Sequence, residues 1–435
     1  MNEYPFKTSH WFNDNIETSQ SVEKNKQIDV VVVGGGFAGI SAAMEIKKFN
    51  KSLSVAIIEA MHVGFGASGR NAGWLQKLPP LFWLLDDFND KCRLEDIKWT
   101  SQYCNESLTE IGNLVNKNTI NCDWKHTQHR LIARNPLEVA TLKWIRPRFE
   151  AIGLKCEYYD RKIAAQFVSY KASAALAYEI VTINPYNLVD GLCQYCKELG
   201  IEIYEHSPIK SILSQKNNVK LSTDRGYTIT ANKVVLATNA YTKFLNTNGI
   251  KMPKTSAYHT YMFATEPLED KFIEKLTVGG TPFGDPTLFF CIGRMHDNRL
   301  LFNGIDRKSQ VTDEEDRHIP SFDKLYKKMI QRFPMLEKIS IDSAWGGAVM
   351  QTSSDAPIVR YADSYKNLIL NIGYGGGSGM GMALHSGKLL IDLISKEGKN
   401  EDAMRLRNLL NSSSFSTAGI FRATFGITGK LLQLH

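Results

Sequence analysis

Residues 28–39 decide the fold, and they read Ile28-Asp29-Val30-Val31-Val32-Val33-Gly34-Gly35-Gly36-Phe37-Ala38-Gly39. The first six residues form a β-branched run that is typical of a strand buried on both faces. The glycines fit the spacing G-x-G-x-x-G, and residues 40–48 continue as a helix-like stretch. A second strand is predicted over residues 54–58, and it closes at Glu59. This order of strand, glycine turn, helix, strand and acid predicts a dinucleotide-binding βαβ unit.

Each part of the unit has a physical role. Gly34 permits the tight turn, Gly36 lets the backbone approach a pyrophosphate, and Gly39 lets the helix pack close to the strand. The first turn of the helix offers free N–H groups and a partial positive charge to the phosphates. Glu59 lies twenty residues after Gly39, where it can accept hydrogen bonds from an adenosine ribose.

The stretch after Glu59 favours FAD over NAD. Residues 62–73 read His-Val-Gly-Phe-Gly-Ala-Ser-Gly-Arg-Asn-Ala-Gly, a run too rich in glycine for a regular element. It allows close backbone approach to a flat ring, while Ser68 and Asn71 offer hydrogen bonds and Arg70 offers a positive fork. Taken alone, the run is also compatible with an ordinary surface loop.

A further strand–glycine–helix unit lies near the C-terminus. A buried strand is predicted over 367–373, and the glycine-rich stretch 374–381 follows it. The helix after it has apolar positions at 389, 390, 393 and 394, and its N-terminus could stabilise negative charge on a flavin ring. Residues 233–240 read as another strand that ends in small residues.

Together these pieces resemble the D-amino-acid-oxidase-type flavoprotein family, and within it the branch of gamma-glutamylputrescine oxidase-like amine oxidoreductases. The resemblance covers nearly the whole chain, and the loop Val63–Gly73 is its most specific part. The stretch 4–11, the strand-like 297–302 and the segment from Trp345 to Gly347 also match the branch.

The resemblance implies an α/β fold in which a Rossmann-type FAD-binding domain is interleaved with a substrate domain built on a mixed or antiparallel β-sheet. The FAD-binding domain is expected to gather residues 1–85, 184–245 and 350–435, and the substrate domain residues 86–183 and 246–349. Strand-like alternation across 250–305 agrees with the second assignment.

The expected FAD-binding residues combine the glycine motif, the loop and the positions that the resemblance adds. They are Gly34, Gly36, Phe37, Ala38, Gly39, Glu59, Ala60, Gly66, Ala67, Ser68, Arg70, Asn71, Ala72, Ile209, Thr238, Asn239, Gly376, Gly377, Ser378, Gly379 and Met380.

The chain departs from the family at positions that matter for chemistry. Glycine oxidase carries a carboxylate-clamping Arg near the segment that here reads Ala348-Val349-Met350. Sarcosine oxidase carries a Lys where this chain has Gly381, and it attaches its flavin through a cysteine near Ala348 or Val349. We therefore expect non-covalent FAD and a substrate without an α-carboxylate beside the reacting nitrogen.

The residues expected to act in catalysis are His259, Tyr261 and Tyr374. Aromatic faces can hold an amine cation on arrival, and His259 would titrate near neutrality. The alternative interpretation of His259 and Tyr261 is a strand that packs aromatic side chains into a sheet face.

The amino-acid composition narrows the classes of function and partner that remain. The net charge of +7 over 435 residues includes no clustered basic stripe, so no nucleic-acid partner is expected. Neither a membrane-spanning run nor metal-ligand spacing appears. Seven dispersed cysteines predict a reducing cytoplasm, with Cys193 and Cys196 as helix-surface or core thiols rather than a redox pair. The basic, apolar tail 415–435 is expected to pack on the FAD domain or to touch a membrane.

The sequence thus predicts an FAD-dependent enzyme that oxidises a primary or secondary amine to an imine, with dioxygen as acceptor. One alternative is an amine or D-amino acid dehydrogenase that passes electrons to a quinone or a partner protein. A second alternative is a non-catalytic, flavin-bound subunit of a complex.

Overall fold

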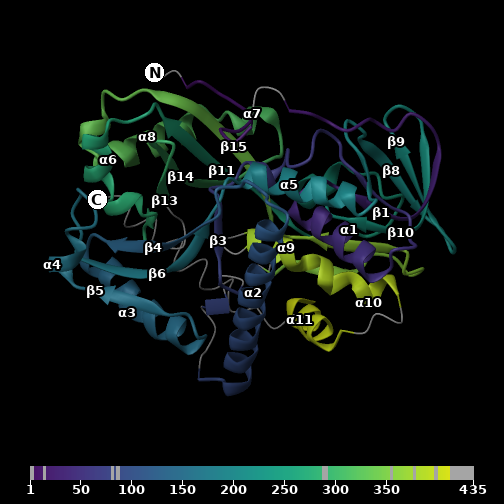
Figure 1. The fold of residues 1–435 in the computed structure, drawn as a ribbon, viewed down its shortest axis with the longest axis horizontal. Helices are drawn as coiled ribbons and strands as arrows, with labels where there is room; N and C mark the ends of the chain where they lie inside the picture. The colour runs from purple at the N-terminus through teal and green to yellow at the C-terminus, as the bar shows by residue number, and fades with distance from the viewer. Residues whose placement is uncertain are drawn as a thin grey trace.

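The computed structural model describes residues 4–12, 16–79, 83–84, 89–286, 292–352, 356–375, 379–395 and 400–411. Two β-sheets lie side by side along the long axis, each with its own helices (Figure 1). The fold is mixed α/β, as the sequence predicts: one sheet is largely parallel, and the other is mixed and almost entirely antiparallel.

The largely parallel sheet contains the strands of the glycine motifs. Its order is β16-β17-β10-β1-β2-β7, with β8 and β9 as an antiparallel extension of β10. The bounds are β1 (Lys26–Val33), β2 (Val55–Ile58), β7 (Glu202–Tyr204), β8 (Ile209–Ser214), β9 (Val219–Thr223), β10 (Thr228–Leu236), β16 (Ile358–Tyr361) and β17 (Leu368–Ile372). Residues 30–33 of β1 are all buried, as expected for a strand covered on both faces.

Helix α1 (Phe37–Phe49) packs against other helices of this half of the molecule. Its neighbours include α5 (Pro185–Glu198) and α9 (Gly379–His385), and a tight contact joins Gly387 to Ser41. Beyond them lie α10 (Ile391–Ile394), α11 (Glu401–Asn411) and the long α2 (Lys91–Lys117) (Figure 1).

The second sheet runs β15-β11-β14-β13-β12-β4-β6-β3, with β5 paired to β6. Only the β12–β4 pair is parallel among the described strands of this sheet. The bounds are β3 (Trp74–Gln76), β4 (Lys125–Ala133), β5 (Cys156–Tyr159), β6 (Ala174–Thr182), β11 (Ser256–Thr265), β12 (Phe283–Gly284), β13 (Ile292–His296), β14 (Arg299–Lys308) and β15 (Ile341–Gln351). The helices of this half are α3 (Pro136–Ala151), α4 (Arg161–Ala164), α6 (Asp270–Leu276), α7 (Asp313–Asp316) and α8 (Ile319–Arg332).

The chain passes between the two sheets several times. The strands of the parallel sheet all come from residues 1–85, 184–245 and 350–435. One strand departs from the expected division: β3 lies within the first of these segments, yet Trp74 pairs with Thr182 in the second sheet. The flavin loop predicted over 62–73 therefore ends directly in a strand of the other half of the molecule.

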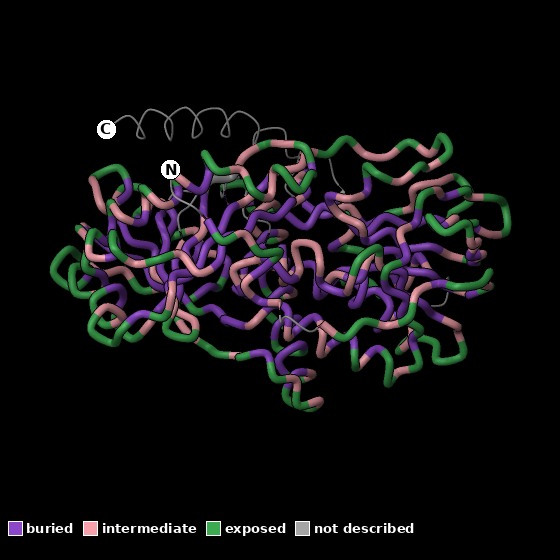
Figure 2. The backbone as a smooth tube through the Cα atoms, turned by 90° about the horizontal axis from the view of Figure 1, so that it is seen from above, coloured by how far each residue is buried: buried purple, intermediate pink, exposed green. Residues whose placement is uncertain are grey.

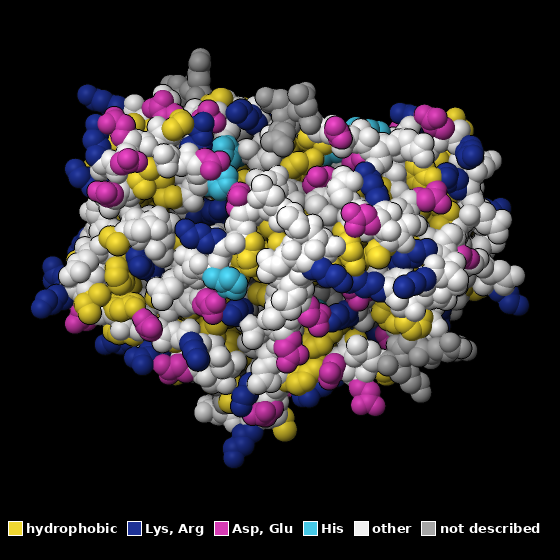
Figure 3. All heavy atoms as spheres, in the orientation of Figure 1, with side chains coloured by type: hydrophobic (Ala, Val, Ile, Leu, Met, Phe, Trp, Pro, Cys, Tyr) yellow, Lys and Arg dark blue, Asp and Glu magenta, His cyan; other side chains and the backbone are white. Residues whose placement is uncertain are grey.

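Buried residues occupy the interior of the molecule, whereas exposed residues gather at the outer loops (Figure 2). Cys193 and Cys196 of α5 are both buried, which selects the core-thiol interpretation. On the face shown in Figure 3, basic and acidic side chains are interspersed. Over the described residues, no helix combines the length and apolarity that a membrane crossing needs. The tail 415–435 lies outside the described residues.

Candidate cofactor-binding and active site

A cavity of about 440 Å³ opens where the parallel sheet meets the second sheet. Val33, Ile58 and Ala237 line it, and they lie at the carboxyl ends of β1, β2 and β10. Ligands of open α/β sheets bind in the crevice outside these ends. The cavity continues from there to β3, β13 and β15 of the second sheet. It therefore has an end formed by the parallel sheet and an end formed by both halves of the molecule.

The first glycine turn is closed by backbone contacts that no larger residue would permit. Gly34 has φ +110°, and a Cβ there would lie 2.8 Å from the carbonyl oxygen of Ala237. A Cβ on Gly39 would lie only 1.8 Å from the carbonyl oxygen of Gly34. Gly39 thus holds α1 against the turn, while Gly34 and Gly36 line the cavity. The first turn of α1 faces this space through Phe37 and Ala38.

Glu59 lies at the end of β2 and also lines the cavity. Its carboxylate accepts hydrogen bonds from the backbone N–H groups of Gly35 (2.6 Å) and Met61 (3.0 Å). Burial nevertheless raises the pKa of Glu59 above its ordinary value, because desolvation outweighs these two donors. A ligand hydroxyl donating to this carboxylate would compensate for the lost solvation.

The loop 62–73 forms the neighbouring wall and is fixed by its own side chains. Ser68 Oγ accepts a hydrogen bond from the N–H of Phe37 at 2.9 Å, which joins the loop to the start of α1. Asn71 Nδ2 donates to the carbonyl oxygens of Ala67 (3.0 Å) and Ser68 (2.9 Å), and its Oδ1 accepts from the N–H of Gly73. The loop is therefore shaped before any ligand arrives.

The second glycine unit lies beside the first, as the parallel pairing of β17 with β10 requires. Asn371 donates to the carbonyl oxygen of Ala38 at 3.2 Å, and it accepts a short hydrogen bond from the hydroxyl of Tyr374. Asn239 Oδ1 accepts from the N–H groups of Gly373 and Tyr374 at 3.0 and 3.3 Å. Tyr374 lines the cavity, and burial raises its pKa, so its hydroxyl stays protonated at neutral pH.

Most of the expected FAD-binding residues meet at this cavity. Those that line it are Gly34, Gly36, Phe37, Ala38, Glu59, Ala60, Gly66, Ala67, Ser68, Asn71, Ala72, Ile209, Thr238, Asn239, Gly379 and Met380. Gly39 and Arg70 are not on the cavity wall. The expected residues Gly376, Gly377 and Ser378 lie outside the described part of the chain.

Arg70 instead connects the loop to the second half of the molecule. Its side chain is 4% exposed, and its Nη1 lies 2.6 Å from Asp316 Oδ2 of α7. Arg70 Nε donates to the carbonyl oxygen of Phe65 at 2.8 Å, and the indole of Trp345 donates to the carbonyl oxygen of Arg70 at 2.9 Å. The guanidinium therefore fixes the loop from behind and does not present a charge to the cavity.

His259 belongs to the same buried network, and this placement differs from the expected catalytic role. The ring is fully buried, with Nδ1 2.6 Å from Ser309 Oγ and Nε2 3.0 Å from Asp316 Oδ1. The second is a close approach and not a hydrogen bond, because the ring nitrogen and the carboxylate are not aligned as a hydrogen bond requires. His259 does not line the cavity, since its side chain points to the face of β11 that α7 covers.

Tyr261 also lies away from the cavity. It is fully buried on the same face of β11 as His259, and its ring meets Phe322 of α8 edge-on at 5.3 Å between centroids. Alternation along a strand places both side chains under the helices of the second half. Of the three expected catalytic residues, Tyr374 alone is on the cavity wall.

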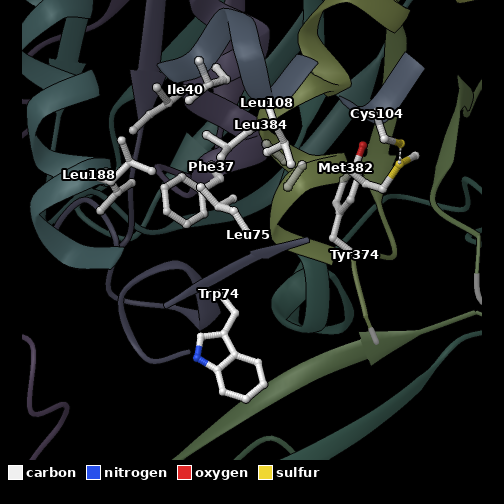
Figure 4. Close-up of a cluster of buried hydrophobic side chains, with 14 of the residues drawn as sticks. Phe37, Ile40, Trp74, Leu75, Cys104, Leu108, Leu188, Tyr374, Met382 and Leu384 are labelled. Carbon is white, nitrogen blue, oxygen red and sulfur yellow. Dashed lines mark hydrogen bonds between the residues drawn. The ribbon is translucent and has the colours of Figure 1, made fainter. Parts of the chain in front are cut away.

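Several wall residues were not anticipated as site residues. At the end near the second sheet these are Gln76 of β3, Ile292 of β13, and Ala348 and Val349 of β15. Trp74 of β3 lines the cavity too. Figure 4 shows Trp74 pointing away from the cluster of Phe37, Leu75 and Leu188. These residues converge from distant strands, so no local motif marks them.

Two further features of the site follow from its titratable groups. Lys210 is the one Lys or Arg among the described wall residues, and it lies beside Ile209 at the end formed by the parallel sheet. Burial raises the pKa of Tyr241, another wall residue, to about 12. Among the described residues, no group of three or more His, Cys, Asp or Glu side chains could hold a metal ion.

Comparisons with known proteins agree with this geometry. Residues 29–393 match a family model described as DAO, FAD dependent oxidoreductase. The chain is 27% identical over 375 residues to a probable oxidoreductase, OrdL, of Haemophilus influenzae, covering 84% of this chain and 82% of that protein. It is 26% identical over 385 residues to the gamma-glutamylputrescine oxidoreductase of Escherichia coli, covering 86% and 85% of the two chains.

The fold comparison points the same way. A crystal structure of glycine oxidase from Geobacillus kaustophilus superposes with a TM-score of 0.69 and 19% sequence identity. The alignment covers 87% of this chain and 96% of the other. At this level of identity the likeness concerns the fold alone.

Proposed function

The chain belongs to the family of FAD-dependent oxidoreductases, and on this premise we propose that it oxidises the C–N bond of a primary or secondary amine to an imine. The proposal has two parts: non-covalent FAD held in the cavity, and an amine substrate without an α-carboxylate beside the reacting nitrogen. Each part is supported by the character of one end of the cavity.

The end formed by the parallel sheet fits FAD. Gly34 and Gly36 leave bare backbone at the wall, and the start of α1, with the partial positive charge of a helix N-terminus, lies directly behind them. Desolvation raises the pKa of the half-buried Glu59 carboxylate, and a ribose hydroxyl would supply it with a further donor. When bound, FAD supplies a two-electron acceptor for the hydride that leaves the carbon beside the substrate nitrogen.

The end formed by both sheets supports an amine without a carboxylate. Its described wall is aromatic, amide and aliphatic, with Trp74, Gln76, Ile292, Val349 and Tyr374. This composition is the observation that carries the proposal, because a carboxylate clamp requires a cation. The resemblance places the clamping Arg of glycine oxidase near Ala348 and Val349, which are small and apolar here.

The two buried arginines nearest this end have other partners. Arg70 pairs with Asp316, and Arg294 Nη1 donates to the carbonyl oxygens of Gly73 (3.0 Å) and Ile183 (2.9 Å). Burial lowers the pKa of Arg294 to about 10, which leaves it charged at neutral pH. Neither lines the cavity, so each acts on the backbone of the loop rather than on a ligand.

The chain's own residues would then act by binding and desolvation. Apolar walls disfavour the charged ammonium and promote release of its proton, which the amine must lose before it can donate hydride. Tyr374, whose hydroxyl is committed to Asn371, orients the substrate and does not accept a proton. The imine leaves the cavity and is hydrolysed by water, and we propose dioxygen as the final electron acceptor.

The decisive test is an anaerobic titration of the purified yellow protein with a small panel. It contains gamma-glutamylputrescine, putrescine, an N-methylamine, glycine, sarcosine and D-alanine. We expect the flavin absorbance to bleach with amines alone. Bleaching by glycine, sarcosine or D-alanine would contradict the missing clamp, and a protein that no member bleaches would contradict the amine activity.

Two assays complete the test. Hydrogen peroxide should appear with turnover in air, whereas its absence, with reduction of an added quinone, would contradict dioxygen as acceptor. Acid precipitation should release the flavin into the supernatant, because no described wall residue is a cysteine. Flavin that stays in the pellet would contradict non-covalent binding.

A further inference from the structure

The backbone of the loop 62–73 is held from behind along its last residues, 69–73. Each of their carbonyl oxygens accepts a hydrogen bond from a side chain outside the loop. The donors are Ser9 Oγ to Gly69 (2.7 Å), Trp345 Nε1 to Arg70 (2.9 Å), Trp11 Nε1 to Asn71 (2.8 Å), and Arg294 Nη1 to Ala72 (3.2 Å) and Gly73 (3.0 Å). None of these donor side chains lines the cavity, whereas Asn71 and Ala72 do. The carbonyl oxygens of this stretch therefore point behind the loop.

The two indoles among these donors belong to one frame. Trp11 is 3% exposed and Trp345 is 1% exposed. The N-terminal segment pairs with β15 at Ala344, directly before Trp345. There the N–H of Lys7 donates to the carbonyl oxygen of Ala344, and the N–H of Ala344 donates to that of Pro5, each at 3.0 Å. The segment that carries Trp11 is thus fixed to the strand that carries Trp345.

The indoles determine how two successive peptide groups of the loop are turned. The described peptide bonds are trans, and in a trans peptide the N–H points opposite to the C=O. The carbonyl oxygen of Arg70 points to Trp345, so the N–H of Asn71 points away from that indole. The carbonyl oxygen of Asn71 points to Trp11, so the N–H of Ala72 points away from Trp11. Both N–H groups are therefore directed away from the side chains behind the loop.

These two N–H groups are donors that the protein itself does not use. Within the described part of the chain, no group accepts a hydrogen bond from the N–H of Asn71 or of Ala72. The N–H groups on either side are paired, that of Arg70 with the carbonyl oxygen of Ala67 (3.4 Å) and that of Gly73 with Asn71 Oδ1 (2.8 Å). The side-chain amide of Asn71 is also committed, because its nitrogen and its oxygen both bond to loop backbone. Unpaired backbone donors on a cavity wall require a partner in the cavity.

The position of the two donors along the cavity indicates that partner. Ser68 joins the earlier part of the loop to the start of α1, and β3 begins at Trp74. Asn71 and Ala72 therefore lie between the parallel-sheet end and the end formed by both sheets. The glycine turn and Glu59 at the parallel-sheet end suit the ADP part of FAD. The flavin ring, with its carbonyl oxygens and ring nitrogens, is the part of the cofactor that remains to accept from this stretch.

We infer that Trp11 and Trp345 are positioning residues for the cofactor, which turn two peptide groups so that the N–H groups of Asn71 and Ala72 donate to the flavin ring. The N-terminal segment, which precedes the dinucleotide-binding unit in the sequence, is on this inference part of the flavin site. The inference goes beyond the proposed function, because it rests on the binding of FAD and not on the oxidation of an amine.

The experiment measures the Kd of the full-length apoprotein for FAD and for ADP by calorimetry. Trp11→Phe keeps a buried aromatic ring and removes the indole N–H, so the peptide group between Asn71 and Ala72 can turn. We expect the Kd for FAD to rise about tenfold while the Kd for ADP stays unchanged. Trp345→Phe should give the same split. An unchanged Kd for FAD, or an equal rise for both ligands, would overturn the inference.

Ser9→Ala is the matched control. Ser9 also donates from the N-terminal segment to a loop carbonyl, that of Gly69, but the N–H of this peptide group belongs to Arg70 and is already paired within the loop. We expect Ser9→Ala to lower stability in urea and to change the Kd for FAD by less than about twofold. A loss of FAD affinity as large as in Trp11→Phe would show that any loosening of the loop has this effect, and it would overturn the role of peptide orientation.

Amide hydrogen exchange of the wild-type protein needs no variant. The N–H groups of Asn71 and Ala72 should exchange about tenfold or more slowly with FAD than in the apoprotein, whereas ADP should leave them fast. Exchange that FAD does not slow would overturn the inference even if both Phe variants failed to fold. FAD-specific protection in a protein that no amine reduces would support the inference and overturn the proposed amine activity.

Discussion

The two ends of the cavity are built by different means. At the parallel-sheet end the backbone forms the wall: Gly34 and Gly36 expose it, and the start of α1 and the carboxylate of Glu59 complete it within one stretch of chain. At the other end side chains form the wall, and they arrive from β3, β13, β15 and the turn at Tyr374. The comparison teaches that cofactor binding is encoded locally, whereas substrate selection depends on packing between distant strands.

The largest effect is expected from Gly39→Ala. The new Cβ would lie 1.8 Å from the carbonyl oxygen of Gly34, so α1 must move away from the turn. We expect the free energy of unfolding to fall by about 3 kcal/mol and FAD to be lost on purification. The measurements are urea denaturation and flavin content.

The control for this change is Gly226→Ala. Gly226 has φ +85° and open space around its Cβ position, so the only cost is backbone strain of about 1 kcal/mol. If both variants lost the same stability, the close packing of Gly39 against the backbone of Gly34 would not be the reason why glycine is needed there.

A smaller effect is expected from Asp316→Asn, which tests the connection between the two ends. The change leaves the buried guanidinium of Arg70 without its carboxylate partner. Because Asp316 is partly exposed, we expect a loss of about 2 kcal/mol and weaker FAD binding, as the loop 62–73 loosens.

His259→Gln is the companion variant, since it removes the second contact of Asp316 and keeps the Arg70 pair. We expect about 1 kcal/mol of destabilisation and an unchanged rate of flavin reduction at saturating amine. A large fall in that rate would instead support the catalytic role that the sequence suggests for His259.

Glu59→Gln sharpens the description of the FAD end. We expect FAD to bind about tenfold more weakly, because the charged acceptor for the ribose is lost. Without FAD, in contrast, the Glu59→Gln protein should be more stable to unfolding than the wild type. Burial raises the pKa of Glu59, so the stability that its neutral form provides is complete below the ordinary value of 4.5 and is lost as the pH rises through the raised pKa.

The measurement is urea denaturation of both apoproteins at pH 5 and pH 7.5. The stability difference in favour of Glu59→Gln should be greater at pH 7.5. If the stability difference between the two apoproteins were the same at both pH values, the pKa of Glu59 would not be raised.

The smallest effect is expected from alanine at Cys193 and Cys196. Both thiols are buried in α5, and burial raises the pKa of Cys193 to about 12, which suppresses its thiolate. We expect neither of these two thiols to react with thiol reagents in the native protein, whereas the exposed Cys92 should react. We also expect a loss of about 1 kcal/mol per alanine and unchanged flavin reduction. Reaction of either thiol before unfolding would revive the redox interpretation of the C-x-x-C pair.

How far the sequence predicts this molecule follows from the same comparison. The turn at Gly34 to Gly39 and the acid Glu59 are close in sequence, and steric rules for glycine suffice to place them. The residue types of His259 and Tyr261 suggest catalysis, but the pleat of β11 turns both side chains under the helices of the second half. Which face of a strand meets the cavity is a tertiary property.

Gln76 illustrates the other side of this limit. Its side chain accepts a hydrogen bond from Tyr178, which lies 102 residues away in the sequence. Tyr178 in turn contacts His129, which lies 49 residues from it. No periodicity or spacing within β3 points to them. The two sheets are confirmed, but the division into an FAD-binding and a substrate domain remains a prediction. β3 shows why the boundary between the domains is hard to place. The loop 62–73 continues directly into this strand of the second sheet, with no linker between them.

The order of strands in the parallel sheet also has a consequence for biosynthesis. β17 (Leu368–Ile372) pairs directly with β10, which pairs with β1. During translation the first glycine turn is made more than three hundred residues before β17, the strand that pairs with β10 on its other side. The nascent chain must therefore hold an open sheet edge while these residues are made, and chains truncated before residue 368 should aggregate and capture no flavin.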